Sequence, residues 1–432
     1  MTAVLLQAPG LATDRVEALL DLERHIIAEQ CAIERWFRCQ WQSTPPPFYG
    51  SVDLRNAGFK LAPVDTNLFP AGFNNLNPEH NALYVTAIQH YLSQYHPGLE
   101  RLLLVPENHT RNFFYLENVA RLVQLLEQSG LHVRIGALQA EGPREMVLPS
   151  GAHLFLEPLE RRASRLGVAG FDPEAILLNN DLSGGVPDIL RGLEQEILPP
   201  LAAGWQTRRK SQHFAHYRKA AEELATVLGI DSWLIDPIYR KCSGIDFMRA
   251  EGQDCLVANV DATLADIGRR YQEYGITARP FVIVKADAGT YGMGIMTVYS
   301  GRELLELNRK TRTRMAKSKE GLPVSDVFIQ EGVHTFEQTA EDFVAEPVVY
   351  MVGQQVLGGF YRVHRERGID ENLNAPGAHF EPMAFAEPGV NPCRNSPPDA
   401  AVNRYYAYGV IARLAMLAAA REARDWREAA NA

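Results

Sequence analysis

The sequence contains few cysteines, and none of them are spaced as in a zinc site or a redox dithiol. Its 432 residues include five, which are widely scattered: Cys31, Cys39, Cys242, Cys255 and Cys393. No C-x-x-C pair occurs, which argues against both kinds of site. Scattered free thiols suit a reducing compartment, and Asp14 and Glu17 stand where a signal peptide would be apolar. We therefore expect a cytoplasmic protein.

The chain also lacks an excess of positive charge and a long apolar run. Lysine and arginine number 43 against 52 aspartate and glutamate residues, which gives a formal net charge of −9. Binding to a nucleic-acid backbone needs a cationic surplus, so no nucleic acid is predicted as a partner. The most apolar late stretch, residues 405–420, contains Arg413 and is too short to cross a bilayer comfortably. A soluble protein that acts on small molecules is predicted, and a homo-oligomer remains open.

The first half of the chain alternates between apolar strands and helices. An amphipathic helix is predicted over residues 13–41, and residues 102–135 have the pattern strand, helix, strand. Another apolar strand, 176–178, runs directly into Asn179, Asn180 and Asp181. Ligands of open parallel sheets sit at the carboxyl ends of the strands. Residues 1–203 are therefore predicted to form an N-terminal helix and a Rossmann-like α/β domain that binds substrate.

Residues 51–75 lie between these elements and are dense in polar groups without a clear period. Residues 204–432 are predicted to form a second α/β domain. Its strands are expected at 281–284, 295–299, 327–330, 348–352 and 356–363, and its helices at 211–228, 302–310 and 402–427. The apolar stripes of the helices at 13–41 and 402–427 are assigned to the core or to oligomer contacts.

The most informative segment is a glycine-rich loop that follows the strand at 281–284. Lys285 ends this strand, and Gly289, Gly292 and Gly294 follow within a few residues. Clustered glycines let the backbone turn sharply and direct several amides at an anion. No Gly-Lys dipeptide is present, which excludes a P-loop, and the glycine spacing is the reverse of the dinucleotide-binding motif. A β-prone segment after the loop predicts a hairpin folded over phosphates.

This arrangement of strand, lysine, glycine loop and strand resembles the ATP-grasp superfamily. The resemblance implies that the hairpin covers ATP, that Lys285 and the upstream Lys210 contact its phosphates, and that 327–333 is the hinge beside adenine. Residues 346–362 resemble the glutathione synthetase hairpin that delivers a catalytic arginine, here Arg362, and Lys285 is assigned a catalytic role as well. The implied nucleotide-binding residues are Lys210, Lys285, Gly289, Thr290, Tyr291, Gly292, Gly294, Gln330, Glu331 and Val333.

Three N-terminal segments, 53–55, 63–75 and 106–112, resemble a small bacterial family of glutamate–cysteine ligases built like glutathione synthetase. This resemblance implies an N-terminal Rossmann-like domain followed by an ATP-grasp fold. It also implies ATP-dependent joining of the glutamate γ-carboxylate, through an acyl phosphate, to cysteine, which is the first step of glutathione biosynthesis. Two alternatives remain, namely another ATP-grasp carboxylate–amine ligase, such as a glutathione-synthetase-like enzyme, and a non-catalytic nucleotide-binding module.

Residue types suggest how an amino acid and a metal ion would be held. Arginine is suited to clamp a carboxylate, and aspartate is suited to accept an ammonium group. For Lys60, a solvated loop charge is an equal alternative to a role in binding. Magnesium prefers oxygen ligands, but the usual late carboxylate and Glu-x-Asn strand of ATP-grasp enzymes is not evident. The predicted substrate-binding residues are Arg55, Asp65, Asn67, Asn74, Asn75, Arg111 and Asn180, and the predicted Mg²⁺ ligands are Glu346, Glu371, Asn372 and Asn374.

Overall fold

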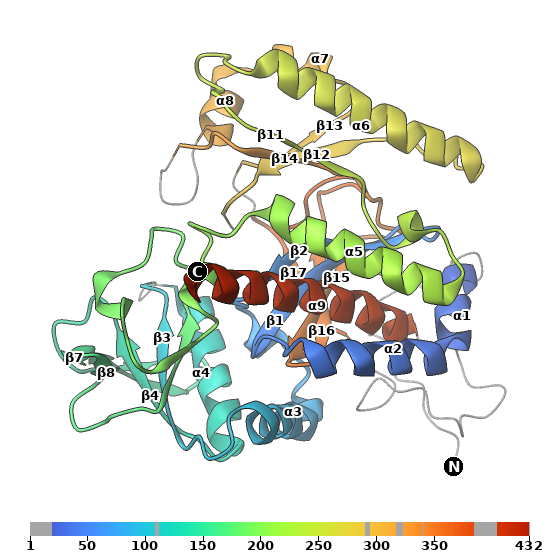
Figure 1. The fold of residues 1–432 in the computed structure, drawn as a ribbon. Coiled ribbons are helices and arrows are strands. Elements are labelled where there is room, and N and C mark those ends of the chain that lie inside the picture. The colour runs from blue at the N-terminus through green and yellow to red at the C-terminus, as the bar shows by residue number, and fades with distance from the viewer. Residues whose placement is uncertain are drawn as a thin grey trace.

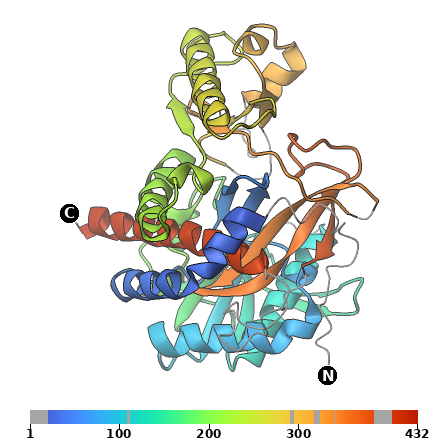
Figure 2. The same ribbon diagram turned by 90° about the vertical axis from the view of Figure 1, so that its right-hand side faces the viewer.

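The computed structural model describes residues 20–108, 112–289, 294–316, 323–339, 341–383 and 404–431. It is a mixed α/β protein with several sheets, in which a layer of helices crosses the middle of the molecule (Figures 1 and 2). Within the described ranges, no helix combines the length and the apolar character that crossing a bilayer requires.

A six-stranded sheet lies in the N-terminal half. Its order is β10 (Glu196–Leu198), β9 (Ala175–Asn179), β3 (Arg101–Pro106), β4 (His132–Ala137), β6 (His153–Pro158) and β5 (Arg144–Val147). Neighbouring strands are parallel except for the β5–β6 pair. Helix α4 (Phe113–Gln128) connects β3 to β4, as predicted, and packs with α3 (Asn81–Tyr95). A small hairpin, β7 (Glu160–Arg162) and β8 (Arg165–Gly167), lies beside this sheet (Figure 1).

A five-stranded antiparallel sheet joins the two halves of the sequence. Its order is β17 (His379–Pro382), β16 (Gln355–His364), β15 (Val344–Val352), β1 (Tyr49–Asn56) and β2 (Leu61–Asn67). The polar stretch at 51–75, which shows no period in the sequence, therefore begins with two paired strands. Residues 49–53 of β1 pair with β15, so this sheet contains strands from both sides of the predicted domain boundary at residue 203.

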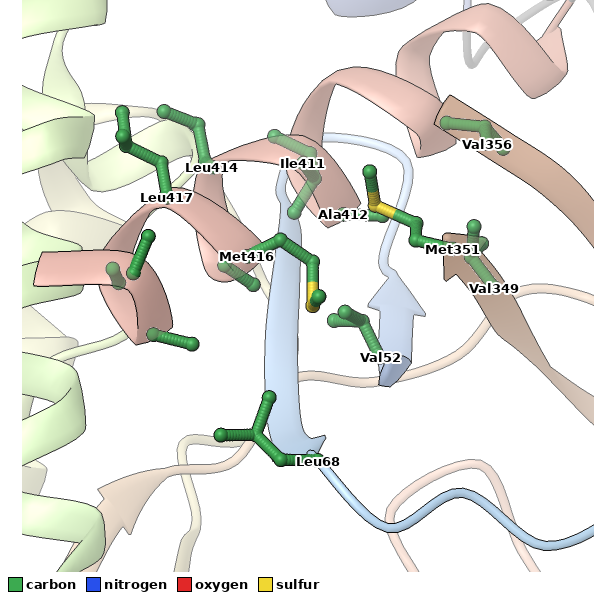
Figure 3. Packing of buried hydrophobic residues seen from close by; sticks show 14 of the residues in the cluster. Val52, Leu68, Val349, Met351, Val356, Ile411, Ala412, Leu414, Met416 and Leu417 are labelled. Carbon is green, nitrogen blue, oxygen red and sulfur yellow. The ribbon is translucent and has the colours of Figure 1, made fainter. Parts of the chain in front are cut away.

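Helix α9 (Arg404–Asn431) packs on the five-stranded sheet and against α5 (Lys210–Leu228) and α1 (Leu20–Ala28). Figure 3 shows Ile411 and Met416 directed toward Val52 and Met351 of this sheet. Almost every side chain from 406 to 420 is buried. Of the two predicted roles for this apolar stripe, core packing and oligomer contacts, the structure shows core packing. The predicted helix at 13–41 is two helices, α1 and α2 (Gln30–Ser43), that meet at Glu29, and its first residues lie outside the described ranges.

A four-stranded antiparallel sheet forms a separate lobe, seen at the top of Figure 1. Its order is β11 (Tyr239–Cys242), β14 (Val327–Glu331), β12 (Val282–Ala286) and β13 (Met296–Val298), and α6 (Gln253–Glu273) packs against it. The predicted helix at 302–310 is two short helices, α7 (Arg302–Leu305) and α8 (Arg309–Met315).

The glycine loop joins two antiparallel strands of this lobe. Residue Ile283 of β12 pairs with Thr297 of β13, so the segment is a hairpin and does not open a helix. Gly289 and Gly294 flank its tip and have φ angles of 106° and 67°, which residues with a side chain rarely adopt. The tip itself, with the predicted Thr290, Tyr291 and Gly292, lies outside the described residues.

Candidate active site

Two adjoining cavities meet at polar side chains of the five-stranded sheet, including Asp53, Asp65 and Arg362. The hinge cavity, of about 670 Å³, lies between this sheet and β12 and β14, and its lining includes Phe281, Ile283, Lys285, Gln330, Glu331 and Val333. The edge cavity, of about 1420 Å³, reaches the carboxyl ends of the parallel strands, and its lining includes Asn67, Asn75, Asn112, Tyr115, Asp181 and Trp205. Both cavities share Asp53, Asp65, Arg362 and Asn374.

Lys285 lines the hinge cavity, and the charges of the shared residues Asp65 and Asp53 act on it. Strand pairing places Ile283 opposite Gln330, so the alternating side chains Ile283 and Lys285 share a face with Gln330. The Lys285 ammonium donates to the Val64 carbonyl at 2.7 Å. Burial lowers the pKa of Lys285 to about 8, and the charge of Lys210 acts in the same direction, while Asp65 opposes both. The pKa of Lys285, and with it the fraction of the lysine that is charged, therefore depends on the neighbouring charges.

Lys210 and Asp65 form an ion pair beside Lys285. The Lys210 ammonium lies 2.9 Å from both Asp65 carboxylate oxygens and 4.0 Å from the centre of the Trp205 ring. Lys210 is the first residue of α5, and its amide donates to the Asp287 carbonyl at 2.8 Å. Burial alone would raise the pKa of Asp65, but Lys210 and Lys285 hold it below its usual range. Two cations and one carboxylate thus converge between the cavities.

Arg362 lies between two carboxylates. One of its terminal nitrogens donates to Glu346 Oε1 at 2.5 Å and to Asp53 Oδ2 at 3.1 Å. Arg55 Nε donates to the other Glu346 oxygen at 2.7 Å. Burial would raise the pKa of Glu346, but Arg55 and Arg362 together lower it. Burial does raise the pKa of Asp53, against the effect of Arg362.

The hinge strand presents one polar side chain to its cavity without a partner. Gln330 is buried, and its side-chain Nε2 has no hydrogen-bond acceptor within the part of the chain that the structure describes. A buried amide donor without an acceptor is costly, so it is well placed to meet a ligand atom. The Glu331 carboxylate, in contrast, is fully engaged by Lys60, Trp233 and the amide of Ile238. Lys60 is therefore a buried ion-pair partner, which excludes the alternative of a solvated loop charge.

The predicted substrate residues separate in space. Asp65, Asn67 and Asn75 line the edge cavity, whereas Arg55 lines only the hinge cavity and is bound to Glu346 and to two backbone carbonyls. Asn74 and Asn180 line neither cavity.

Asn180 stabilises the turn after β9. Its side-chain oxygen accepts from the amide of Leu182, and its amide donates to the Pro106 carbonyl. Asparagine readily makes such local bonds, and here they occupy both ends of the side chain. The predicted Arg111 lies outside the described residues.

Three of the four predicted magnesium ligands have oxygens that already accept hydrogen bonds from other groups. Both Glu346 oxygens accept from arginines, and both Glu371 oxygens accept from Arg367 and Gly368. The Asn372 side-chain oxygen accepts from the amide of Asn374. Among the residues that the structure describes, no cluster of three or more His, Cys, Asp or Glu side chains could hold a metal ion.

Sequence reasoning missed three residues that shape this site. Asp53 lies directly opposite Asp65 in the β1–β2 pair, and this relation is visible only once the two segments are known to be strands. Phe114 at the start of α4 and Phe380 on β17 stack with ring centres 5.8 Å apart and both line the edge cavity. No signal in the sequence connects these two residues, because their contact depends on the tertiary fold.

Comparisons with known proteins place this geometry in context. A family model described as glutamate-cysteine ligase matches residues 23–423. No curated protein sequence matches the chain. A crystal structure from Methylobacillus flagellatus KT, of a protein provisionally assigned as a gamma-glutamylcysteine synthetase, is 55% identical, covers 96% of this chain and 99% of its own, and has a TM-score of 0.88.

Two other solved structures show much weaker likeness. D-alanyl-alanine synthetase A from Vibrio cholerae is 12% identical over 73% of this chain and 81% of its own, with a TM-score of 0.33. A glutathione synthetase-like effector from Globodera pallida is 9% identical over 83% of this chain and 82% of its own, with a TM-score of 0.38. Likeness at this level carries no argument about function.

Proposed function

This chain belongs to the glutamate–cysteine ligase family, and from that premise we propose that ATP binds in the hinge cavity and the amino acids in the edge cavity. The protein is a glutamate–cysteine ligase, and the proposal concerns how its residues carry out the ligation. The observation that carries it is the junction of the two cavities at Asp53, Asp65, Arg362 and Asn374. A phosphoryl group held in one cavity could there reach a carboxylate held in the other.

The adenine end of ATP is assigned to the region around Gln330 and Val333. Apolar side chains of Phe281, Ile283 and Val333 line this part of the cavity, which suits the faces of a purine ring. The buried Gln330 amide that lacks an acceptor among the described residues suits its polar edge. A lobe that closes a hairpin over the nucleotide is the arrangement expected of an ATP-grasp fold, which we propose for this half of the chain.

The phosphate end is assigned to the cations at the junction. Lys285, Lys210 and Arg362 surround it, and the amides of the glycine hairpin follow Lys285 in the sequence. Fixed positive charge in a buried site stabilises the negative charge of a transferring phosphoryl group more strongly than it would in water. On nucleotide binding, Lys210 would share its charge between Asp65 and a phosphate oxygen.

The reaction proceeds in two steps in this proposal. A glutamate γ-carboxylate oxygen attacks the γ-phosphorus of ATP, and the bond to ADP breaks to give an acyl phosphate. The cysteine amine then attacks the acyl carbon, loses a proton, and displaces inorganic phosphate. No protein nucleophile is required, and the chain's role is to orient the reactants and neutralise charge.

Magnesium is assigned to the nucleotide and not to a prepared protein site. The oxygens of three predicted ligands, Glu346, Glu371 and Asn372, accept from other donors in the structure, so these three do not fit a resident ion. Magnesium commonly binds through substrate phosphates with few protein carboxylates. We therefore derive no step from a metal held by the protein alone.

Isotope transfer tests the proposal directly. With glutamate labelled by ¹⁸O in its γ-carboxylate, ATP and cysteine, the released phosphate should carry one labelled oxygen, and the product should have the mass of γ-glutamylcysteine. Unlabelled phosphate would exclude the acyl phosphate. Phosphate release that continues undiminished without cysteine would contradict the assignment of cysteine as the amine that attacks the acyl phosphate.

A further inference from the structure

The tip of the β1–β2 hairpin reaches from the five-stranded sheet into the four-stranded lobe. Phe59 stacks on Trp233 with ring centres 6.1 Å apart and meets Tyr271 edge-on at 5.6 Å. The next residue, Lys60, has a side chain that is only 1% exposed. The hairpin thus inserts an aromatic ring and a charged group into the packing beneath the hinge strand.

Lys60 makes its main contact with the hinge residue Glu331. Its ammonium lies 2.9 Å from Glu331 Oε2, donates to the Asp236 carbonyl at 2.9 Å, and stands 4.3 Å from the centre of the Trp233 ring. The Glu331 carboxylate also accepts from Trp233 Nε1 at 3.1 Å and from the Ile238 amide at 2.8 Å. This carboxylate is therefore held by donors from three segments of the chain.

A buried ion pair of this kind adds little to stability, because desolvation offsets most of the attraction between the charges. Its geometric effect is larger, since it fixes two segments in one register. Here the two segments are the two walls of the hinge cavity. Asp53, Arg55 and Asp65 on the strands of the same hairpin line one wall, and Gln330 and Val333 on either side of Glu331 line the other.

We propose that Lys60 is a nucleotide-positioning residue, which acts through Glu331 to hold the hinge strand at the spacing that ATP requires. The inference rests on the assignment of ATP to the hinge cavity. Lys60 does not line that cavity, so it has no direct contact with the nucleotide. Its influence should fall on ATP and spare the amino acids in the edge cavity.

Substitution of Lys60 gives the first test. Lys60→Met should raise the KM for ATP about tenfold while the KM values for glutamate and cysteine stay unchanged. Lys219→Met, at an exposed position on α5, is the matched control and should behave as the wild type. An unchanged KM for ATP, or an equal rise in all three KM values, would overturn the inference.

A double variant separates positioning from direct contact. Lys60→Met leaves a buried carboxylate unpaired, which is destabilising, whereas Lys60→Met/Glu331→Gln removes both charges and keeps an acceptor for Trp233 and Ile238. The double variant should recover most of the affinity for ATP and the melting temperature. Recovery of the melting temperature alone, with ATP affinity still lost, would show that Lys60 acts on the nucleotide by another route.

The wild-type enzyme offers a measurement that needs no variant. Binding of a non-hydrolysable ATP analogue should slow hydrogen exchange at residues 57–60 as well as at the hinge, because the ion pair connects them. Slowing at the hinge alone would contradict the inference. If the wild type binds no ATP analogue at all, the proposed function fails instead, and the two failures are thereby distinguished.

Discussion

At the residue scale, Lys285 is a group of the hinge cavity whose charge should change with pH. Burial lowers its pKa to about 8 in the free enzyme, so the charged form is lost as the pH rises through 8. Because kcat/KM reports the ionisation of free enzyme, kcat/KM for ATP should fall with rising pH above about 8. Steady-state kinetics between pH 6.5 and 9.5 at fixed amino-acid concentrations would measure this.

The same lysine can be separated from other titrating groups. Lys285→Arg keeps a charge at every pH tested, so the fall above pH 8 should disappear even if the rate is lower. Lys285→Met should abolish turnover. A fall of the same shape in the arginine variant would assign the ionisation to a different group.

Arg362 is predicted to act mainly on the transition state. It faces both cavities and already holds Asp53 and Glu346. Arg362→Lys keeps a positive charge but loses the planar pair of donors, and we expect kcat to fall about 10²-fold with the KM for ATP nearly unchanged. Melting curves of the variant check the fold, and a rise in KM with kcat intact would contradict this role.

The sequence singled out some residues that line the hinge cavity and gave no role to others. Lys285, Gln330, Glu331, Val333 and Arg362 meet at one cavity, as the resemblance implied, although their roles remain predictions. Asp53 was not assigned because strand β1 is buried along nearly all its length, and Lys60 was not assigned because its contact with the distant Glu331 depends on the tertiary fold. A strand buried on both faces lacks the alternation of polar and apolar residues from which strands are recognised.

At the scale of elements, helix α9 is attached to α5 by a buried charge cluster. Glu422 accepts from Arg208 at 2.8 Å and lies 2.7 Å from His213 Nδ1. Glu422→Gln leaves the buried Arg208 without a charged partner, and we expect a loss of about 3 kcal/mol in the free energy of unfolding. Chemical denaturation would measure the loss, with Glu428→Gln at an exposed position of the same helix as control.

The charges around Glu422 also predict how the free energy of unfolding depends on pH. Burial would raise the pKa of Glu422, but Arg208 and His213 lower it to about 2. A carboxylate whose pKa is lower in the folded state stabilises the protein above its unfolded pKa of about 4.3 and loses that contribution as the pH falls toward 2. The difference in stability between wild type and Glu422→Gln should therefore shrink between about pH 4 and pH 2.

Strands with continuous apolar runs and helices with an apolar face were predictable, and the exact breaks between elements were not. The strands β3, β4, β9, β12 and β14 and the helices α5 and α9 lie where the periodicity predicts them. The predicted helix at 302–310 is divided, because Asn308 caps α8 through its side chain and so starts a new helix. Such breaks depend on single hydrogen bonds that a hydrophobic pattern does not reveal.

At the scale of the whole molecule, metal binding should depend on the nucleotide. No cluster of carboxylate, histidine or cysteine side chains within the described ranges is ready to hold a cation. Titration with Mn²⁺, followed by electron paramagnetic resonance, should therefore show little binding to the free protein and strong binding once ATP is present. Tight, stoichiometric binding of Mn²⁺ to the free protein would contradict this prediction, because it would require a metal site that is formed without the nucleotide.

The shared five-stranded sheet has a consequence for biosynthesis of the chain. β1 and β2 leave the ribosome long before β15 and β16, which complete their sheet. Until then the apolar surfaces of the nascent hairpin have no permanent cover, and exposed surface of this kind promotes aggregation. The five-stranded sheet thus cannot consolidate until β15 and β16 have been translated, and we expect the yield of folded protein to depend on chaperones during translation.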